Sequence, residues 1–401
     1  MSDKSSGLSL AFACAGHAYS HLFMLLYPTV VLALEGVFGL PFGELLPLAL
    51  PGFIAFGVCA LPAGWLSDRW SAMGMLTVFF IGTGCAAIVT GLAQSPLGIG
   101  VGLTLIGVFA SIYHPVGTAW VVRHAARRGK ALGVNGLFGN LGVAAAALLA
   151  GALTDLISWR AAFIAPGVLA IATGVAFALF ARSGAMATRT EDRVAQAEPA
   201  RADTIRMMCV IAVTSLCGGL IFQSMTIGLP KVFDVRLTGF VTGTLGVGVM
   251  VSIVYAVAGF AQIAVGHLVD RYPLKPLFSI IFLLQAPLLY LAADLFDLPL
   301  MLIAIVFVFL NVGALPVSEA VVARYTPVDR RATIYGAKFV IALGVAALAI
   351  PMVALIHERT GDFALLFTIL GTLALVVAIA ALFLPPERRA PAAAASLEQA
   401  D

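Results

Sequence analysis

The feature that most constrains this chain is a succession of apolar runs, each about twenty residues long and separated by short polar turns. A hydrocarbon core of about 30 Å requires roughly 20 apolar residues of helix, so each run is long enough to cross a bilayer. Composition agrees, because 61% of residues are hydrophobic and only 11% are charged, whereas soluble chains average about 25% charged. The sequence predicts an all-α membrane protein whose solvent is the lipid bilayer.

Twelve membrane-spanning helices are predicted, in two bundles of six. The first six cover residues 8–35, 44–67, 72–93, 97–121, 131–154 and 160–181. The second six cover residues 206–233, 240–268, 274–294, 299–322, 332–357 and 362–384. The domains are therefore an N-terminal bundle (1–181), a polar cytoplasmic linker (182–205), a C-terminal bundle (206–384) and a disordered cytoplasmic tail (385–401).

Lysine and arginine predict the orientation of these spans. Of the 23 such residues, Arg160, Lys231, Arg236 and Arg359 fall on the side opposite the termini, and Lys338 falls inside a span. All the others lie on the side of the termini. Cytoplasmic segments of membrane proteins carry the excess of Lys and Arg. Both termini and the linker are therefore expected to be cytoplasmic.

A charged turn occurs twice. The segment Gly64-Trp-Leu-Ser-Asp68-Arg69-Trp70 returns as Gly266-His-Leu-Val-Asp270-Arg271-Tyr272, which is 202 positions later. The same offset of 202 separates Tyr27-Pro28 from Leu229-Pro230. An offset of 201 separates His114-Pro115 from Leu315-Pro316. Two six-helix copies enter the membrane from the same side, so the repeat is parallel, with a pseudo-two-fold axis along the membrane normal. Secondary transporters use such duplicated bundles to expose two faces alternately.

These features resemble the major facilitator superfamily of transporters over nearly the whole chain. The repeated G-x-L-x-D-R turn is similar to its loop signature, and Trp159-Arg160-Ala-Ala-Phe163 resembles the start of its sixth helix. A narrower resemblance is to drug exporters of the fosmidomycin-resistance type. It rests on the motifs Ser20-His21, Tyr27-Pro28 and Ser111-Ile-Tyr-His114-Pro115, although Val116 stands where that group can carry glutamate. The resemblance implies a monomeric secondary transporter of a small-molecule substrate, coupled to H+, in a bacterial inner membrane.

The repeated turn is a candidate cytoplasmic gate. Its aspartates can meet the positive N-terminal ends of neighbouring helices. By the superfamily pattern, those ends are the starts of span 11 near Arg331 and span 5 near Lys130, and the contacts would hold an outward-open state. The alternative is a polar turn with a positive-inside arginine. The predicted gate comprises Gly64, Asp68, Arg69, Gly266, Asp270 and Arg271.

Three histidines of the first half lie at membrane depth. Ionisable residues there cost roughly 2.5–3.5 kcal/mol on insertion scales, so each is a candidate for function. His17 and His21 are four residues apart and share a helix face, and His114 precedes the helix-bending Pro115. They could form interhelical hydrogen bonds, carry a proton, bind a polar or anionic substrate group, or chelate a metal. Because no nearby Asp, Glu or Cys completes a metal set, no metal or cofactor is predicted.

The second half contributes different polar groups. Gln223 occupies the position equivalent to His21, and Lys338 is either a counter-ion for substrate or half of an ion pair with Glu319. Glu319 could instead belong to a cytoplasmic gate. Asn140 lies among glycines at three-residue spacing in span 5, where close helix packing is the favoured interpretation. The predicted substrate or proton pathway comprises His17, His21, His114, Asn140, Gln223, Asn311, Glu319, Tyr335 and Lys338.

Several classes of function are excluded. The sequence contains no G-x-x-x-x-G-K-[ST] loop, so ATP-driven transport by this chain alone is excluded, and no catalytic motif indicates an enzyme. The formal net charge of +3 provides no argument for nucleic acid as a partner. The predicted function is proton-linked efflux of a small polar or amphiphilic compound. Uptake of a small organic anion is the nearest alternative, followed by metal transport or a non-transporting sensor.

Overall fold

The computed structural model of the 401-residue chain describes residues 3–124, 128–182, 200–326, 338, 340–341 and 344–386. Within these ranges every regular element is a helix, which confirms the all-α prediction. Eleven described segments are long and apolar enough to cross a membrane. The predicted span at 332–357 falls largely outside the described residues, and its described part includes α16 (Ala346–Thr360). The twelve-helix, two-bundle architecture is consistent with these elements.

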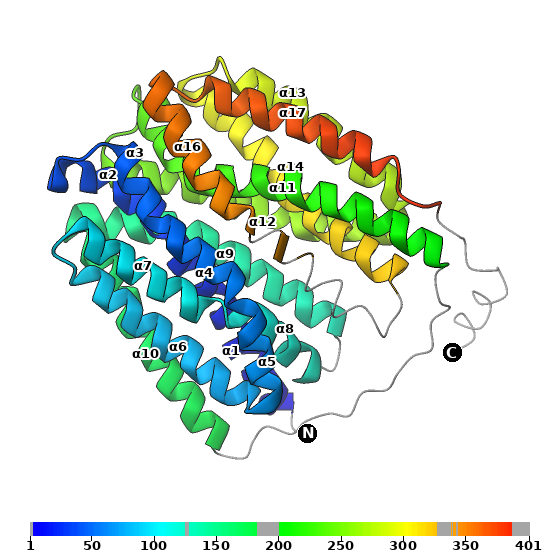
Figure 1. Cartoon of the computed structure of the whole chain (residues 1–401), viewed down its shortest axis with the longest axis horizontal. Coiled ribbons are helices and arrows are strands. Elements are labelled where there is room, and N and C mark those ends of the chain that lie inside the picture. The colour runs from blue at the N-terminus through cyan, green and yellow to red at the C-terminus, as the bar shows by residue number, and fades with distance from the viewer. Residues whose placement is uncertain are drawn as a thin grey trace.

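The N-terminal half contains six membrane crossings, three of which are interrupted (Figure 1). The uninterrupted helices are α6 (Ala72–Gly91), α9 (Arg128–Leu156) and α10 (Ala161–Arg182). The first crossing consists of α1 (Asp3–Leu25) and α2 (Tyr27–Phe38), and the fourth of α7 (Pro96–Ala110) and α8 (Tyr113–His124). The second consists of α3 (Phe42–Leu45), the 3-10 helix η1 (Leu46–Ala49), α4 (Leu50–Val58) and α5 (Ala60–Arg69).

The C-terminal half is built from longer helices. They are α11 (Arg201–Arg236), α12 (Gly243–Arg271), α13 (Leu274–Ala292), α14 (Asp297–Tyr325), α16 and α17 (Ala364–Ala381). α11 begins at Arg201, so the last part of the segment predicted as linker is helical. Residues 183–199 of that linker and residues 387–401 of the predicted tail lie outside the described ranges.

Proline explains the interruptions in the first half. The breaks at Leu26, at Cys59 and at Ser111–Ile112 are followed within a few residues by Pro28, Pro62 and Pro115. Proline lacks the backbone N–H for the preceding turn, and its ring clashes with the carbonyl four residues earlier. The sequence predicted the bend at Pro115 but not the other two. In the second half, Pro230 and Pro316 lie inside the continuous helices α11 and α14.

The surface of the bundle is apolar, as the span prediction requires. Large side chains such as Leu97, Leu156 and Phe260 are more than half exposed. Monomeric soluble proteins rarely present extended apolar surface of this kind. The exposed side chains therefore form the expected contact with lipid, while the buried ones form a core that runs through both halves.

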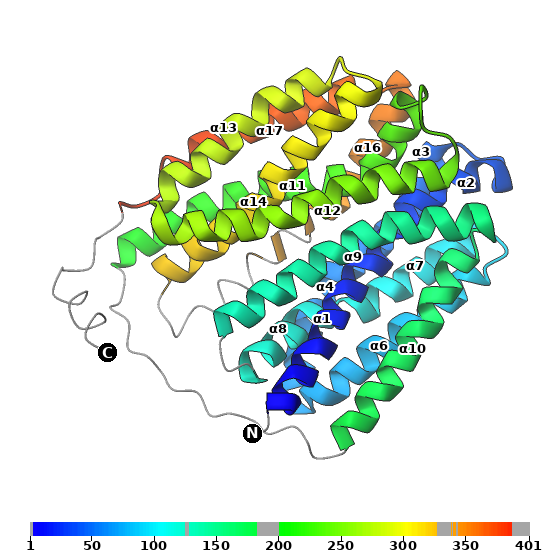
Figure 2. The same ribbon diagram turned by 180° about the vertical axis from the view of Figure 1, so that it is seen from behind.

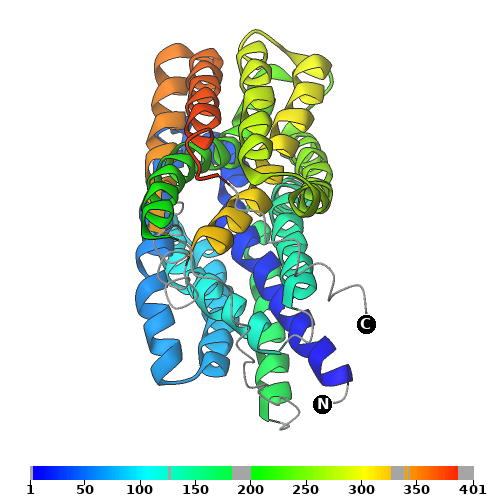
Figure 3. The ribbon, with the colours of Figure 1, turned by 90° about the vertical axis from the view of Figure 1, so that its right-hand side faces the viewer.

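The described residues begin at Asp3 and finish at Pro386 at one end of the molecule, here called the terminal face, where α5, α10 and α12 end (Figures 1 and 2). The opposite end, where α2 and α16 end, is called the far face. Figures 1 and 2 show the two bundles side by side, with α9 and α12 between them. Seen from the side, the blue-to-green first half lies against the green-to-red second half (Figure 3).

The two halves pack closely along α9 and α12. Gly151 and Gly248 lie against the backbone carbonyls of Thr244 and Ala147 respectively, and a Cβ on either glycine would collide with that carbonyl. Small residues allow helix backbones to approach closely in membrane proteins. Asn140 Nδ2 of α9 donates to the Tyr255 carbonyl of α12 at 2.7 Å, so the two helices are also joined by a buried hydrogen bond.

A matching anchor stabilises the far face of each half. In the first half, Arg160 donates to the carbonyls of Gly91 (3.0 Å) and Ala93 (2.6 Å). In the second half, the position equivalent to Arg160 by the 202-residue offset is Asp362, which binds the buried Arg236. Arg236 then donates to the carbonyls of Ala292 (2.9 Å) and Leu295 (3.3 Å). The two halves therefore share the carbonyl acceptors, but the arginine that donates to them lies at different positions of the repeat.

The anchor of the second half has an electrostatic consequence. Arg236 Nε and Nη2 lie 2.7 and 2.6 Å from the two carboxylate oxygens of Asp362, a bidentate geometry. Hydrogen bonding from this guanidinium holds the pKa of Asp362 below its ordinary value of 3.8. The aspartate is therefore stabilised in its charged form at the end of α16 and the start of α17.

Candidate functional site

The three histidines predicted from the sequence form one cluster in the first half. The ring centroids of His17 and His21 are 5.0 Å apart, and each lies 5.4 Å from that of His114. One ring nitrogen from each residue lies within 4.8 Å of the others. All three side chains are partly exposed. The i,i+4 spacing on α1 and the bend before α8 therefore bring together residues that are nearly a hundred positions apart.

A hydrogen-bonded chain holds His17 in place. Its Nδ1–H donates to the Asn135 carbonyl at 2.7 Å, because a carbonyl can only accept. The Asn135 amide donates to the Tyr113 hydroxyl (2.7 Å), and that hydroxyl donates to the Ala13 carbonyl (2.7 Å). The Tyr113 ring also stacks on His17 at 5.1 Å between centroids. The orientation of the His17 ring is thus set by three helices.

Glycines of α9 make room for this cluster. A Cβ on Gly139 would lie 2.6 Å from His17 Cε1 and Nε2, and a Cβ on Gly142 would collide with the Ala18 carbonyl. A Cβ on Gly136 would lie 3.0 Å from the Gln262 side chain of the other half, whereas a Cβ on Gly133 would meet no described atom within 4 Å. Close packing therefore accounts for three of the four glycines at three-residue spacing. It explains how α1 and α9 approach closely enough for the Asn135 bond.

The second half carries a separate charged pair. Lys338 Nζ lies 2.5 Å from Glu319 Oε1, so the ion pair that the sequence left open is formed. The lysine is 8% exposed, while the glutamate side chain is 45% exposed. Asn311 is buried in α14, and Gln223 is partly buried on α11, where its amide oxygen accepts from Thr226 at 3.4 Å. Tyr335 lies outside the described residues.

The predicted gate residues lie at the terminal face. Asp68 is 3.8 Å from Arg123, and both side chains are largely exposed, so this is a weak pair within the first half. The Arg69 guanidinium lies over the Trp65 ring at 4.1 Å, and a Cβ on Gly64 would be 3.3 Å from Pro115.

In the second copy of the turn, Asp270 and Arg271 are exposed, and a Cβ on Gly266 would meet no described atom within 4 Å. The predicted partners of these aspartates are Arg331 and Lys130. Arg331 and the Lys130 side chain are not among the parts of the chain that the structure describes.

At the far face an ion pair joins the halves, and sequence reasoning had missed it. Lys231 Nζ of α11 lies 2.6 Å from Glu35 Oε2 of α2 and 3.1 Å from Asp234 Oδ2 of its own helix. Glu35 Oε1 also accepts from the Phe42 backbone N–H at 3.1 Å. His357 of α16 meets the Phe42 ring edge-on at 5.6 Å. Comparison of the two halves could have indicated Lys231 as a candidate, because the equivalent position of the first half is Thr29.

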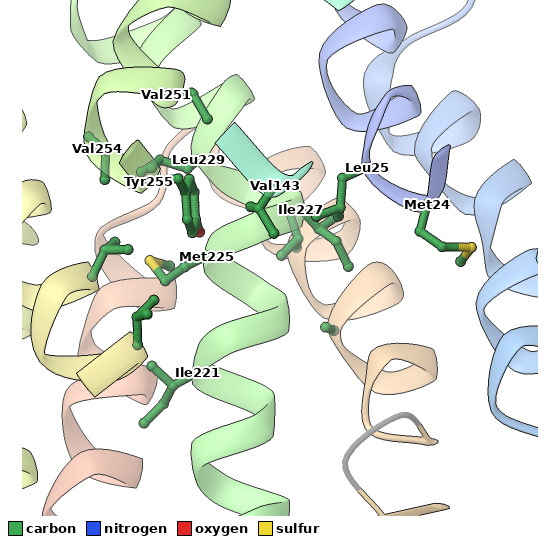
Figure 4. Packing of buried hydrophobic residues seen from close by; sticks show 14 of the residues in the cluster. Met24, Leu25, Val143, Ile221, Met225, Ile227, Leu229, Val251, Val254 and Tyr255 are labelled. Atoms are coloured by element: carbon green, nitrogen blue, oxygen red, sulfur yellow. The ribbon is translucent and has the colours of Figure 1, made fainter. Parts of the chain in front are cut away.

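Apolar packing continues inward from this ion pair. Figure 4 shows Leu25 and Val143 of the first half facing Val251 and Tyr255 of the second. A cavity of about 10 Å³ lies between these residues, close to the smallest volume that holds one water molecule. At this depth the halves are therefore in tight contact, while the histidine cluster and Glu319 keep access to solvent or lipid.

Comparison with known proteins agrees with this architecture. The family model of the Major Facilitator Superfamily matches residues 8–247 and 237–400. A puromycin resistance protein of Streptomyces alboniger is 32% identical over 110 residues, which is 27% of this chain and 22% of that protein. The chain thus matches about a fifth of the length of that curated relative.

Solved structures share the fold. An inward-facing, unoccupied bacterial homologue of the human lysosomal transporter Spinster has 13% identity and a TM-score of 0.74, covering 96% of this chain and 95% of that one. A D-xylose–proton symporter has 14% identity and a TM-score of 0.73, covering 94% and 97% respectively. The fold and family indicate a transporter rather than an enzyme. The chain is a member of the Major Facilitator Superfamily.

Proposed function

We propose that this chain exports a small polar or amphiphilic molecule by proton-linked alternating access. The observation that carries the proposal is the division of polar groups between the halves. The first half holds the histidine cluster, the second holds Glu319 and Lys338, and the halves are tightly joined at the far face. Rocking of the halves about a central site is the means of alternating access in such folds.

The positive-inside distribution supports a cytoplasmic terminal face, with both termini inside a bacterial inner membrane. With that orientation, we propose that the Glu35–Lys231 pair closes the outer side and that the structure represents an inward-facing state. We propose that Asp68 and Asp270 latch the halves in the opposite, outward-open state. The Asp68–Arg123 pair within one half then represents the released latch.

The charged pair of the second half is proposed as the proton-responsive element. Lys338 is nearly buried and Glu319 is its partner. Protonation of the carboxylate would leave the lysine charge without that partner, and an uncompensated buried charge is strongly unfavourable. A change of protonation at Glu319 can therefore bias the conformational equilibrium. His17, His21, His114, Asn140, Gln223, Asn311 and Tyr335 are proposed to line the pathway of the cargo.

Export is supported over uptake by three observations. The relative from Streptomyces alboniger is a resistance protein, and the first half resembles exporters of the fosmidomycin-resistance type. The pair with Glu319 already compensates the Lys338 charge, which an anion-uptake transporter would use for its substrate. The transporter is proposed to act as a monomer, because each chain holds both halves.

Proteoliposomes test the proposal. Purified protein is reconstituted with a trapped pH dye, and puromycin and other small amphiphilic drugs are supplied as first probes across an imposed pH gradient. We expect drug movement against the proton flux. Glu319→Gln should abolish gradient-driven movement while preserving drug exchange between equal concentrations. Gradient-driven transport that survives Glu319→Gln would refute the assigned proton role, and transport independent of pH would refute proton coupling.

A further inference from the structure

The histidine cluster has the dimensions of a metal site. His17 Nε2 and His21 Nε2 are 3.3 Å apart. Two imidazoles that bind one zinc ion at about 2.0–2.1 Å in tetrahedral geometry place their nitrogens about 3.4 Å apart. The ligand nitrogen of His114 completes a set within 4.8 Å, so modest rotation of this ring would bring it to the same ion.

The surroundings orient one of the rings for coordination. The Nδ1–H of His17 donates to the Asn135 carbonyl, which leaves the Nε2 lone pair directed to His21. Metal-binding histidines almost always donate their other ring N–H to a carbonyl, carboxylate or water in this way. Gly139 allows this position of the ring, because any side chain there would displace it. His17 is therefore held in the tautomer that a metal ligand requires.

The donor set selects the class of ion. Among the described residues, this group consists of three imidazoles and contains neither carboxylate nor thiolate. Imidazole suits zinc, copper, nickel and iron, whereas calcium and magnesium prefer oxygen ligands. Three protein ligands leave one tetrahedral position for water or another ligand, as in open zinc sites. His21 would shift its proton from Nε2 to Nδ1 by exchange with solvent, so that its Nε2 can bind.

We propose that His17, His21 and His114 bind one divalent transition-metal ion of the zinc class at the centre of the first half. A simple hydrogen-bonded cluster would account for the His17–His21 contact. The convergence of a third imidazole within 4.8 Å, beside a His17 tautomer that presents Nε2, is the arrangement of a shared metal site. These histidines are also proposed to line the cargo pathway, but the metal site is argued from their geometry within one half, so metal binding can be tested without transport.

Zinc alone is the probe for this site. The full-length protein is purified in detergent with a tag that contains no histidine, and zinc binding is measured by competition with a chromophoric indicator. We expect one equivalent to bind, with affinity at least about tenfold weaker in His21→Ala and in His114→Ala. His267→Ala is the matched control and should leave binding unchanged, because this exposed histidine of α12 hydrogen-bonds to Ile263 of its own helix.

A spectroscopic measurement identifies the ligands. Cobalt substitution should produce the visible absorption of a tetrahedral site, and X-ray absorption of the zinc form should show three imidazole nitrogens at about 2.0 Å. Folding is checked by the melting temperature without metal, and His21→Gln replaces His21→Ala if the latter unfolds. The proposal is overturned if the wild type binds zinc no more tightly than the triple alanine variant, or if the variants retain the same cobalt spectrum. No transport assay is involved, so these results do not depend on the export proposal.

Discussion

Replacing Glu35 by glutamine should shift the transporter away from the conformation described here. The Glu35–Lys231 pair joins α2 of one half to α11 of the other at 2.6 Å. If the halves separate at the far face, this pair must break. Glutamine retains an oxygen that can accept from the Phe42 N–H, so the local capping of α3 is preserved while the charge is removed.

The magnitude follows from the burial of the two partners. Removal of one member of a fully buried pair costs about 3–5 kcal/mol, whereas exposed pairs are worth about 0.2–1 kcal/mol. The Lys231 side chain is 9% exposed and that of Glu35 is 30% exposed, which places the pair between these limits. Asp234, 3.1 Å from the lysine, retains part of the interaction. We therefore expect a shift of about 1–2 kcal/mol, or roughly 5–30-fold in the population ratio.

Spin-label distances measure this shift. Val37 at the end of α2 and Leu298 at the start of α14 are both exposed, and they lie on opposite halves at the far face. In a background without the native cysteines, labels at these positions should report a larger population of long distances in Glu35→Gln. Asp234→Asn is the control, because the Lys231–Asp234 pair lies within one helix and does not join the halves.

Two results would refute this reasoning. An unchanged distance distribution in Glu35→Gln would show that the ion pair does not contribute to closure of the far face. Equal shifts in Glu35→Gln and Asp234→Asn would show that the local charge of Lys231 matters, rather than the connection between the halves.

Two further predictions concern stability. Gly139→Ala should lower the free energy of unfolding by about 1–3 kcal/mol, because its Cβ collides with His17, whereas Gly133→Ala should be tolerated; thermal unfolding of both variants is the measurement. The bond from Arg236 lowers the folded-state pKa of Asp362, so its contribution is present above the ordinary value of 3.8 and is lost as pH falls through the folded pKa. The melting temperature of Asp362→Asn should therefore lie below that of wild type at pH 5–7 and converge with it in acid; a constant difference would contradict this linkage.

Much of the fold could be predicted because hydropathy is a local property. Apolar runs predicted the spans to within a few residues over most of the chain, and the turn around Asp68 and Asp270 revealed the duplication. The pairing of His17 with His21 was also predictable, since residues four apart share a helix face. Pro28 and Pro62 could have indicated the helix breaks that went unpredicted.

The site was less predictable. Glu35 and Lys231 are adjacent only because α2 and α11 meet at the far face, and neither their spacing nor their types indicate this. Glu319 and Lys338 were candidates for a pair, but the choice between pair, counter-ion and gate required their 2.5 Å separation. Asn140 was expected to pack or to line a cavity, and the structure shows that it bonds across the halves to Tyr255.

By itself the sequence determined the number of spans, their order and their duplication. A chain in lipid must satisfy its backbone hydrogen bonds within each helix, so a run of apolar residues is sufficient to specify a span. The tertiary structure alone decided which polar groups meet, and at which end the halves are closed. Those contacts depend on the register of helices far apart in the chain, and the same sequence must allow more than one such arrangement if the halves are to move.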